Sequence, residues 1–134
     1  MYAEKLGLEV GFYPSPYDLL GHYGDELLRA ARLVIDPALH MSEHRWTRQQ
    51  GIEFMRANTT LDEHDVVSEV ERYCVLPAQA CSYMIGQLKL LELRERVLAT
   101  PGLSIVDFHR VVLLAGAVPL TTLERAIERL IQQA

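Results

Sequence analysis

The sequence has 134 residues, which suits one domain, and 49% of them are hydrophobic, enough to build a core without a disulfide framework. The net charge of −5 and the scattering of basic residues among acidic ones exclude non-specific binding to nucleic acid, which requires clustered positive charge. No run approaches the roughly 20 apolar residues of a membrane span, and the first residues lack a signal-peptide pattern. We expect a chain that stays in the cytoplasm as given, although a preceding segment could carry an export signal.

Apolar periodicity, capping residues and breakers predict an all-α fold of seven helices with no strands. The helices are expected at residues 2–10, 17–35, 47–57, 62–73, 77–99, 105–114 and 122–132. No linker or internal repeat interrupts them, so residues 1–134 are predicted to form a single irregular helical bundle.

Four helix starts carry a capping-box pattern, in which a hydroxyl and an acid or amide three residues later satisfy free amides. The pairs are Thr47 with Gln50, Thr60 with Glu63, Ser104 with Asp107, and Thr121 with Glu124. The first helix has no residue before it that would cap it. This indicates either a helix cut in the middle or a frayed natural start.

Cys74 and Cys81 are seven residues apart, on either side of Pro77. This spacing does not match a zinc cluster or a redox pair. Because both lie in apolar surroundings, we predict two buried free thiols.

The polar residues Gln79, Tyr83, Gly86 and Gln87 fall at i, i+4, i+7 and i+8, which is one face of the predicted helix at 77–99. This face is either functional or structural, with tight helix packing at Gly86 as the structural alternative. Arg72 ends the preceding helix. It either caps the last carbonyls of that helix, the simpler interpretation, or leans toward Tyr83 to hold a carboxylate.

The segment from His40 to His44 has the pattern H-x-x-E-H, the metal motif of inverted zinc peptidases. That motif needs both histidines on one continuous helix. Here Pro37 predicts a new short helix capped by Asp36, so the segment is a connection and we expect surface histidines without a metal. Whether Asp36 pairs with His40 is left to the tertiary structure.

Several separated segments resemble, in order, the bacterial domain-of-unknown-function family 885. They are residues 2–7, 29–34 with Asp36 and His40, 46–47, 71–73, the run Pro77-x-Gln79-Ala80-x-x-Tyr83-x-x-Gly86, 88–94 and 116–120. The resemblance runs from end to end of the chain. Ala78 stands where the family usually has glycine.

Members of that family look like helical zinc metallopeptidases of the gluzincin type. The resemblance places their zinc ligands upstream of Met1: a His-Glu segment and the glutamate that opens Glu-Gly-Trp-Ala-Leu-Tyr-x-Glu. It therefore implies that this chain is the C-terminal part of a longer bacterial protein. Zinc is expected in that longer protein, and no cofactor is expected in this chain.

The resemblance also implies roles for five residues of this chain. Tyr83 is expected to stabilise an oxyanion during hydrolysis, and Arg72 to bind a substrate carboxylate. Gln79 and His40 are expected to line the cleft. Glu4 is expected to stand beside a metal ligand without itself binding the metal.

Two functions follow from these observations. In the first, the chain forms the substrate cleft of a zinc-dependent hydrolase of peptide-like substrates, inactive alone, with the missing N-terminal part as its partner. In the second, it is a free-standing, non-enzymatic helical module that associates with itself through exposed apolar surface.

Overall fold

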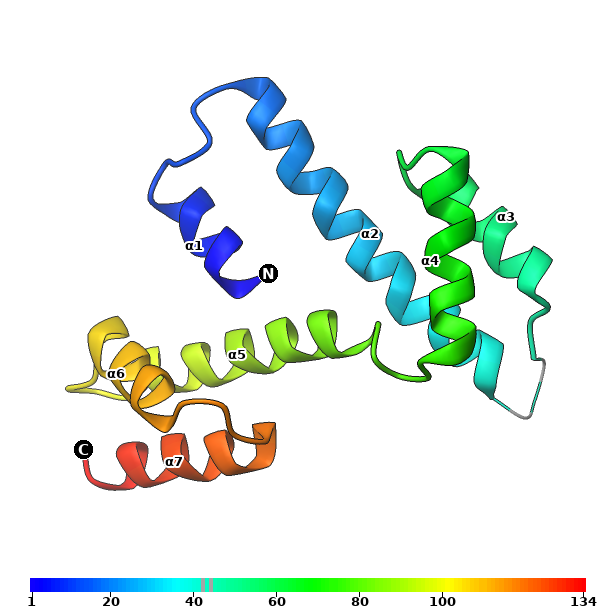
Figure 1. Cartoon of the computed structure of the whole chain (residues 1–134). Helices are drawn as coiled ribbons and strands as arrows, with labels where there is room; N and C mark the ends of the chain where they lie inside the picture. Colours follow the sequence, from blue (N-terminus) through cyan, green and yellow to red (C-terminus); the bar gives the residue numbers. More distant parts are fainter. Residues whose placement is uncertain (42, 44) are drawn as a thin grey trace. The chain divides into compact units, whose positions relative to one another are not determined.

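The computed structural model describes residues 1–41, 43 and 45–134, and in these residues it contains seven α-helices and no strand (Figure 1). The predicted all-α fold is therefore confirmed. The helices are α1 (Tyr2–Glu9), α2 (Pro16–His40), α3 (Arg48–Asn58), α4 (Glu63–Val75), α5 (Ser82–Leu98), α6 (Ile105–Ala115) and α7 (Leu120–Gln132). None of these helices is both long and apolar enough to cross a lipid bilayer.

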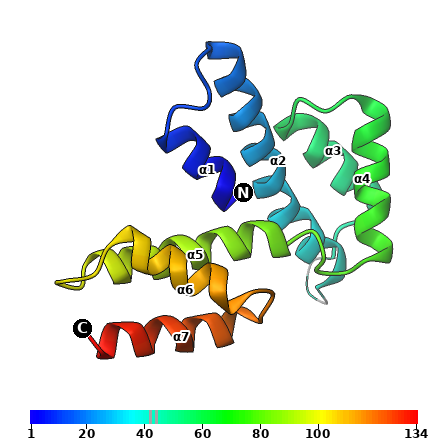
Figure 2. The same ribbon diagram turned by 60° about the vertical axis from the view of Figure 1, so that its left-hand side comes forward.

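The described residues group into two compact units, residues 1–85 and residues 86–134. In the first unit α2, α3 and α4 lie against one another (Figures 1 and 2). Their apolar faces share one buried core. It is made of Ala31, Ile35 and Leu39 of α2, Ile52 and Met55 of α3, Val66, Val70 and Tyr73 of α4, and Ala80.

Gly51 allows α3 to approach both of its neighbours. A Cβ atom at this position would lie 3.1 Å from Val70 Cγ1 and 3.3 Å from Ile35 Cγ2. Both distances are tighter than ordinary carbon contacts. The glycine therefore keeps α3 close to α2 and α4, the two helices that carry the polar residues described below.

In the second unit α6 packs against α7. Its buried apolar residues are Leu93 and Val97 of α5, Phe108 of α6, and Leu123 and Ile127 of α7. An ion pair on its surface joins Lys89 Nζ to Glu124 Oε1 at 2.7 Å.

Two of the four predicted capping boxes are confirmed, those of Thr47 with Gln50 and Ser104 with Asp107. The other two predictions are wrong. Asp62, not Thr60, caps α4, and α7 begins after Pro119 without a side-chain cap. A further capping box, formed by Ser15 with Asp18, starts α2 and was not predicted.

The prediction that a new helix begins at Pro37 is wrong, because α2 continues through Pro37 to His40. Asp36 is therefore inside a helix and does not cap one. A proline within a helix costs about 3 kcal/mol. The buried core contacts of Ile35 and Leu39 on either side of it help to offset this cost.

The helix predicted to begin at Pro77 begins instead at Ser82. The preceding residues form turns, with Gln79 N–H donating to the Leu76 carbonyl and Ser82 N–H to the Gln79 carbonyl. The spacing of Gln79 and Tyr83 predicts that they share a face of one helix. This prediction is wrong, because Gln79 lies in the turns before α5. Tertiary contacts, described next, bring them to the same site.

Candidate functional site

Three polar residues of α2, Arg32, Asp36 and His40, follow one another at intervals of four. Residues four apart lie on the same side of an α-helix, so the three form a row, here called the α2 stripe. All three are at least partly buried. Residues of α4, of the turn before α5 and of the first turn of α5 contact this stripe.

Arg32 is held by two residues of α4. Its Nε and Nη2 atoms donate to Glu69 Oε2 at 3.1 and 2.7 Å, and Nε also donates to the Tyr73 hydroxyl at 3.0 Å. That hydroxyl in turn donates to Glu69 Oε2 at 2.6 Å. These contacts hold the Arg32 guanidinium against Glu69 and Tyr73 of α4.

Arg72 binds the same carboxylate oxygen from the other side, through Nη2 at 2.9 Å. Its Nη1 atom donates to Gln79 Oε1 at 2.6 Å. The simpler interpretation of Arg72 as a cap of its own helix is wrong. The side chain leans across the turn to Gln79. The alternative had it lean toward Tyr83 to hold a substrate carboxylate, and that role stays a prediction.

Two guanidinium groups thus share one carboxylate, so the cluster of Arg32, Arg72 and Glu69 has one excess positive charge. Burial tends to raise the pKa of Glu69. Hydrogen bonds from Arg72 and Tyr73 and the charge of Arg32 outweigh it, and the pKa is lowered. Burial and the hydrogen bond to Glu69 raise the pKa of Tyr73, which therefore remains neutral. Asp36, one turn along α2, carries a second carboxylate, whose Oδ1 atom accepts the Ala78 N–H and pairs with His40.

Tyr83 lies beside this cluster. The Arg32 guanidinium carbon is 5.5 Å from the centre of the Tyr83 ring, a cation–π distance. Tyr83 is 41% exposed, so part of this residue is open to solvent. Arg72, Gln79 and Tyr83, three of the five predicted site residues, are therefore brought together around Arg32 and Glu69.

His40 joins the site through Asp36. The His40 Nδ1 atom lies 2.7 Å from the Asp36 carbonyl oxygen and 3.1 Å from Asp36 Oδ1. The same Oδ1 atom accepts the Ala78 N–H at 3.0 Å. The question left open by the sequence is answered, because Asp36 and His40 do pair.

Ala78 adopts a φ of +66°, in the left-handed region. This region is unfavourable for every residue with a Cβ and is usually occupied by glycine. The strained conformation directs the Ala78 amide to Asp36. It also explains why glycine would suit this position.

The two cysteines differ. Cys81 is buried as predicted, but Cys74 is exposed, so the prediction of two buried thiols is wrong for Cys74. Burial, followed by the charge of the neighbouring Asp36 carboxylate, raises the pKa of the Cys81 thiol. Cys81 therefore remains a protonated thiol at neutral pH.

Glu4 does not contact the residues of the α2 stripe directly. Its Oε1 atom pairs with Arg29 Nη2 of α2 at 3.3 Å. Arg29 is three residues before Arg32, so Glu4 adjoins the N-terminal end of the stripe. No contact within the described part of the chain links Glu4 to Tyr83 or His40.

Within the described residues, no three histidine, cysteine, aspartate or glutamate side chains converge as a metal site would require. The H-x-x-E-H pattern cannot be followed in full, because His44 lies outside the described residues. His40 is the last residue of α2, and Glu43 is exposed beyond it. The residues that the structure describes do not fit a zinc ion.

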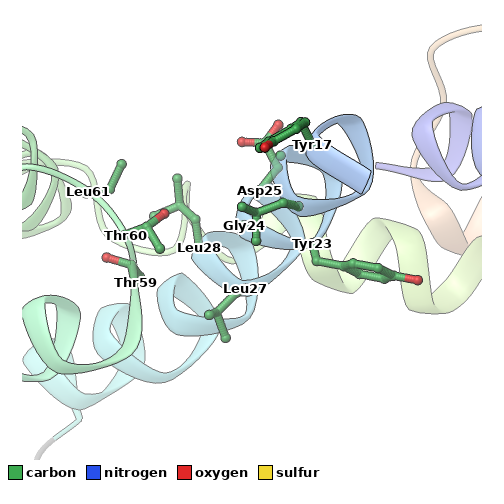
Figure 3. A pocket seen from close by; sticks show the side chains of 11 residues that line it. Tyr17, Tyr23, Gly24, Asp25, Leu27, Leu28, Thr59, Thr60 and Leu61 are labelled. Atoms are coloured by element: carbon green, nitrogen blue, oxygen red, sulfur yellow. The ribbon is translucent and has the colours of Figure 1, made fainter. Parts of the chain in front are cut away.

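A separate hollow of 540 Å³ lies near the start of α2 (Figure 3). Its walls are mostly apolar and include Tyr17, Leu20 and Leu27 of α2 and Leu61 of the connection before α4. Arg32, Asp36 and His40 do not line it. The hollow is therefore distinct from the candidate site.

Sequence reasoning missed Arg32 and Glu69 as site residues. The spacing of Arg32 from Asp36 and His40, four residues each time, is a signal that was available. For Glu69 the only signal is its position three residues before Arg72, which is common on any helix surface.

Comparisons with known proteins place the chain in a family. A model of the family described as "Bacterial protein of unknown function (DUF885)" matches residues 1–127. A crystal structure described as "the putative lipoprotein from Colwellia psychrerythraea" is similar over 99% of this chain, with 43% sequence identity and a TM-score of 0.93. The match covers 23% of that chain, so this sequence spans less than a quarter of the Colwellia protein. A comparison with curated proteins finds no match. The chain belongs to the bacterial family DUF885.

Proposed function

We propose that this chain forms the substrate-binding wall of a hydrolase that acts on peptide-like substrates and whose remaining parts lie in a longer protein. The observation that carries the proposal is the pairing of two guanidinium groups with one carboxylate beside an accessible tyrosine. The great length of the Colwellia protein relative to this chain is consistent with a site completed by other segments. Its description as a lipoprotein supports export of such a longer protein.

In this proposal the excess positive charge attracts an anion, and Arg72 binds a carboxylate of the substrate. Neither Arg72 Nε nor Arg32 Nη1 has a hydrogen-bond acceptor among the described residues, so both can serve a ligand. A hydrogen bond from a charged guanidinium N–H to a carboxylate oxygen is short and strong, so each of these two nitrogens can contribute one such bond.

The Tyr83 hydroxyl then donates a hydrogen bond to the oxygen of the substrate carbonyl, which becomes negatively charged during attack by water. Such a donor is most effective when it is fixed before the reaction. Contact between the Tyr83 ring and Arg32 provides this fixation. Zinc, which the family resemblance implies, would activate the water. Because the described residues do not fit a zinc ion, its ligands would have to come from the rest of the longer protein.

A chimera tests the proposal. Residues 1–134 replace the corresponding quarter of the Colwellia protein, and the product is assayed on peptides with free and amidated C-termini. We expect Tyr83→Phe to lower kcat by about 100-fold, the usual effect of losing one oxyanion donor. The matched control is Tyr17→Phe, since Tyr17 is 84% exposed and outside the site. An unchanged kcat in the Tyr83→Phe chimera would contradict the proposal.

The second candidate function is a helical module that associates with another copy of itself. The supporting observation is the exposed apolar surface of α2, where Tyr17, Leu20 and Leu27 are 84%, 68% and 47% exposed. Monomeric proteins seldom leave large apolar surfaces uncovered. This function and the first one are not exclusive.

A further inference from the structure

Among the described residues, the ring of His40 has contacts at one nitrogen only. Its Nδ1 atom faces the Asp36 carbonyl oxygen at 2.7 Å and Asp36 Oδ1 at 3.1 Å. Both atoms are hydrogen-bond acceptors, so Nδ1 must carry the hydrogen. In the neutral ring the other nitrogen, Nε2, then has a free lone pair.

Asp36 is itself held in place. Its carboxylate is 2% exposed, and its Oδ1 atom accepts the amide hydrogen of Ala78 as well as the bond from His40. The acceptor that determines the His40 tautomer is thus fixed by the backbone of the turn before α5. This is the arrangement by which proteins orient a histidine for proton transfer.

The Nε2 atom of His40 has no hydrogen-bond partner among the described residues, and the side chain is 26% exposed. His40 and Arg72 are anchored to consecutive residues of one turn. Asp36, the partner of His40, binds Ala78, and Arg72 binds Gln79. A ligand bound at Arg72 therefore lies close to the part of the chain that positions His40.

From this geometry we infer that His40 Nε2 is the hydrogen-accepting group of the substrate site, with Asp36 as its positioning residue. The inference rests on the proposed function, since the donor is an N–H or O–H group of the peptide-like ligand. Nε2 accepts a hydrogen bond from that donor through its lone pair and no covalent bond is broken, while the contacts of Nδ1–H with Asp36 keep this lone pair available.

Nuclear magnetic resonance of the ¹⁵N-labelled 134-residue chain tests the inference in two stages. At a pH where the rings are neutral, long-range ¹H–¹⁵N correlation identifies which ring nitrogen carries hydrogen. We expect the Nδ1–H tautomer for His40. The exposed His64, which serves as an internal reference, should show the Nε2–H tautomer that free histidine favours. An Nε2–H tautomer at His40 would overturn the inference.

The second stage adds acetyl-alanyl-alanine, which supplies a carboxylate and amide donors. We expect the His40 Nε2 resonance to shift together with the side-chain resonances of Arg72. His40→Gln should weaken binding about fivefold, the equivalent of one hydrogen bond. This variant should fold, because residue 40 ends α2 and is partly exposed.

The outcomes separate the two proposals. If the peptide shifts the side-chain resonances of Arg72 but not the His40 Nε2 resonance, the inference is overturned and the proposed function stands. A response at His40 alone supports the inference and overturns the carboxylate site. No response at either residue overturns both. The peptide with an amidated C-terminus is the control, since it retains the N–H donors and lacks the carboxylate.

Discussion

Glu69 accepts hydrogen bonds on one oxygen atom from the side chains of Arg32, Arg72 and Tyr73. Removing its charge would leave two guanidinium groups close together without compensation. We expect Glu69→Gln to lower the free energy of unfolding by about 2 kcal/mol, the range for a partly buried charged hydrogen-bond network. Urea denaturation at neutral pH measures this loss.

The same substitution has a predicted pH dependence. The pKa of Glu69 is lower in the folded chain than the ordinary value of 4.5. Its stabilising contribution is therefore complete above pH 4.5 and is lost as the pH falls through the lower, folded value. The difference in unfolding free energy between the original chain and Glu69→Gln should shrink as the solution is acidified below pH 4.5. A constant difference would show that Glu69 is not held as an anion by its partners.

Ala78 offers a substitution that should stabilise the protein. Because its φ of +66° is strained for alanine, we expect Ala78→Gly to raise the free energy of unfolding by about 0.5–1 kcal/mol. Ala30→Gly inside α2 is the control and should lower it by about 1 kcal/mol. Equal losses from both substitutions in urea denaturation would contradict the left-handed conformation of Ala78.

At the scale of elements, two predicted capping boxes differ in outcome. The one at Ser104 starts α6, whereas the one predicted at Thr121 is absent from the start of α7. Ser104 accepts the Asp107 N–H, and its hydroxyl donates to Asp107 Oδ2 at 2.5 Å. Ser104→Ala should lower stability by about 1 kcal/mol. Thr121→Ala should have little effect, since Thr121 lies within α7 and does not cap it. Thermal unfolding followed by circular dichroism distinguishes the two, and equal losses would contradict this difference.

The sequence predicted the positions of the helices better than their ends. Apolar periodicity located all seven helices, because burial of a face imposes its period on the sequence. The ends were less predictable, as at Thr60, because more than one neighbouring residue can cap a helix. Pro37 predicts a helix start, but local sequence does not reveal the core contacts of Ile35 and Leu39 that help to keep α2 continuous.

The candidate site was also predictable only in part. Arg72, Gln79 and Tyr83 do meet, although Gln79 is in a turn and not on the expected helix face. Glu69 and Arg32, which bring them together, belong to different helices whose contact arises from the shared core. Such pairings between distant residues are set by tertiary packing and cannot be read from spacing along one helix.

At the scale of the whole molecule, the exposed apolar residues of α2 predict self-association. Gel filtration coupled to light scattering should show an apparent mass that rises with concentration. Leu20→Glu should reduce this rise, because it places a charge in the apolar surface. Leu113→Glu is the control, since Leu113 is 78% exposed, against 68% for Leu20, but belongs to α6. A constant monomeric mass at high concentration would contradict association with a second copy.

The regular spacing of the α2 stripe has a consequence for the chain lengths that the family can tolerate. Deleting one residue between Arg32 and Asp36 would rotate everything after the deletion by about 100° about the helix axis. Asp36 and His40 would then leave the site together, and Leu39 would leave the core. Insertions and deletions should therefore be rare within this part of α2, whereas the connection between α1 and α2 can vary in length without moving any residue of the stripe relative to another.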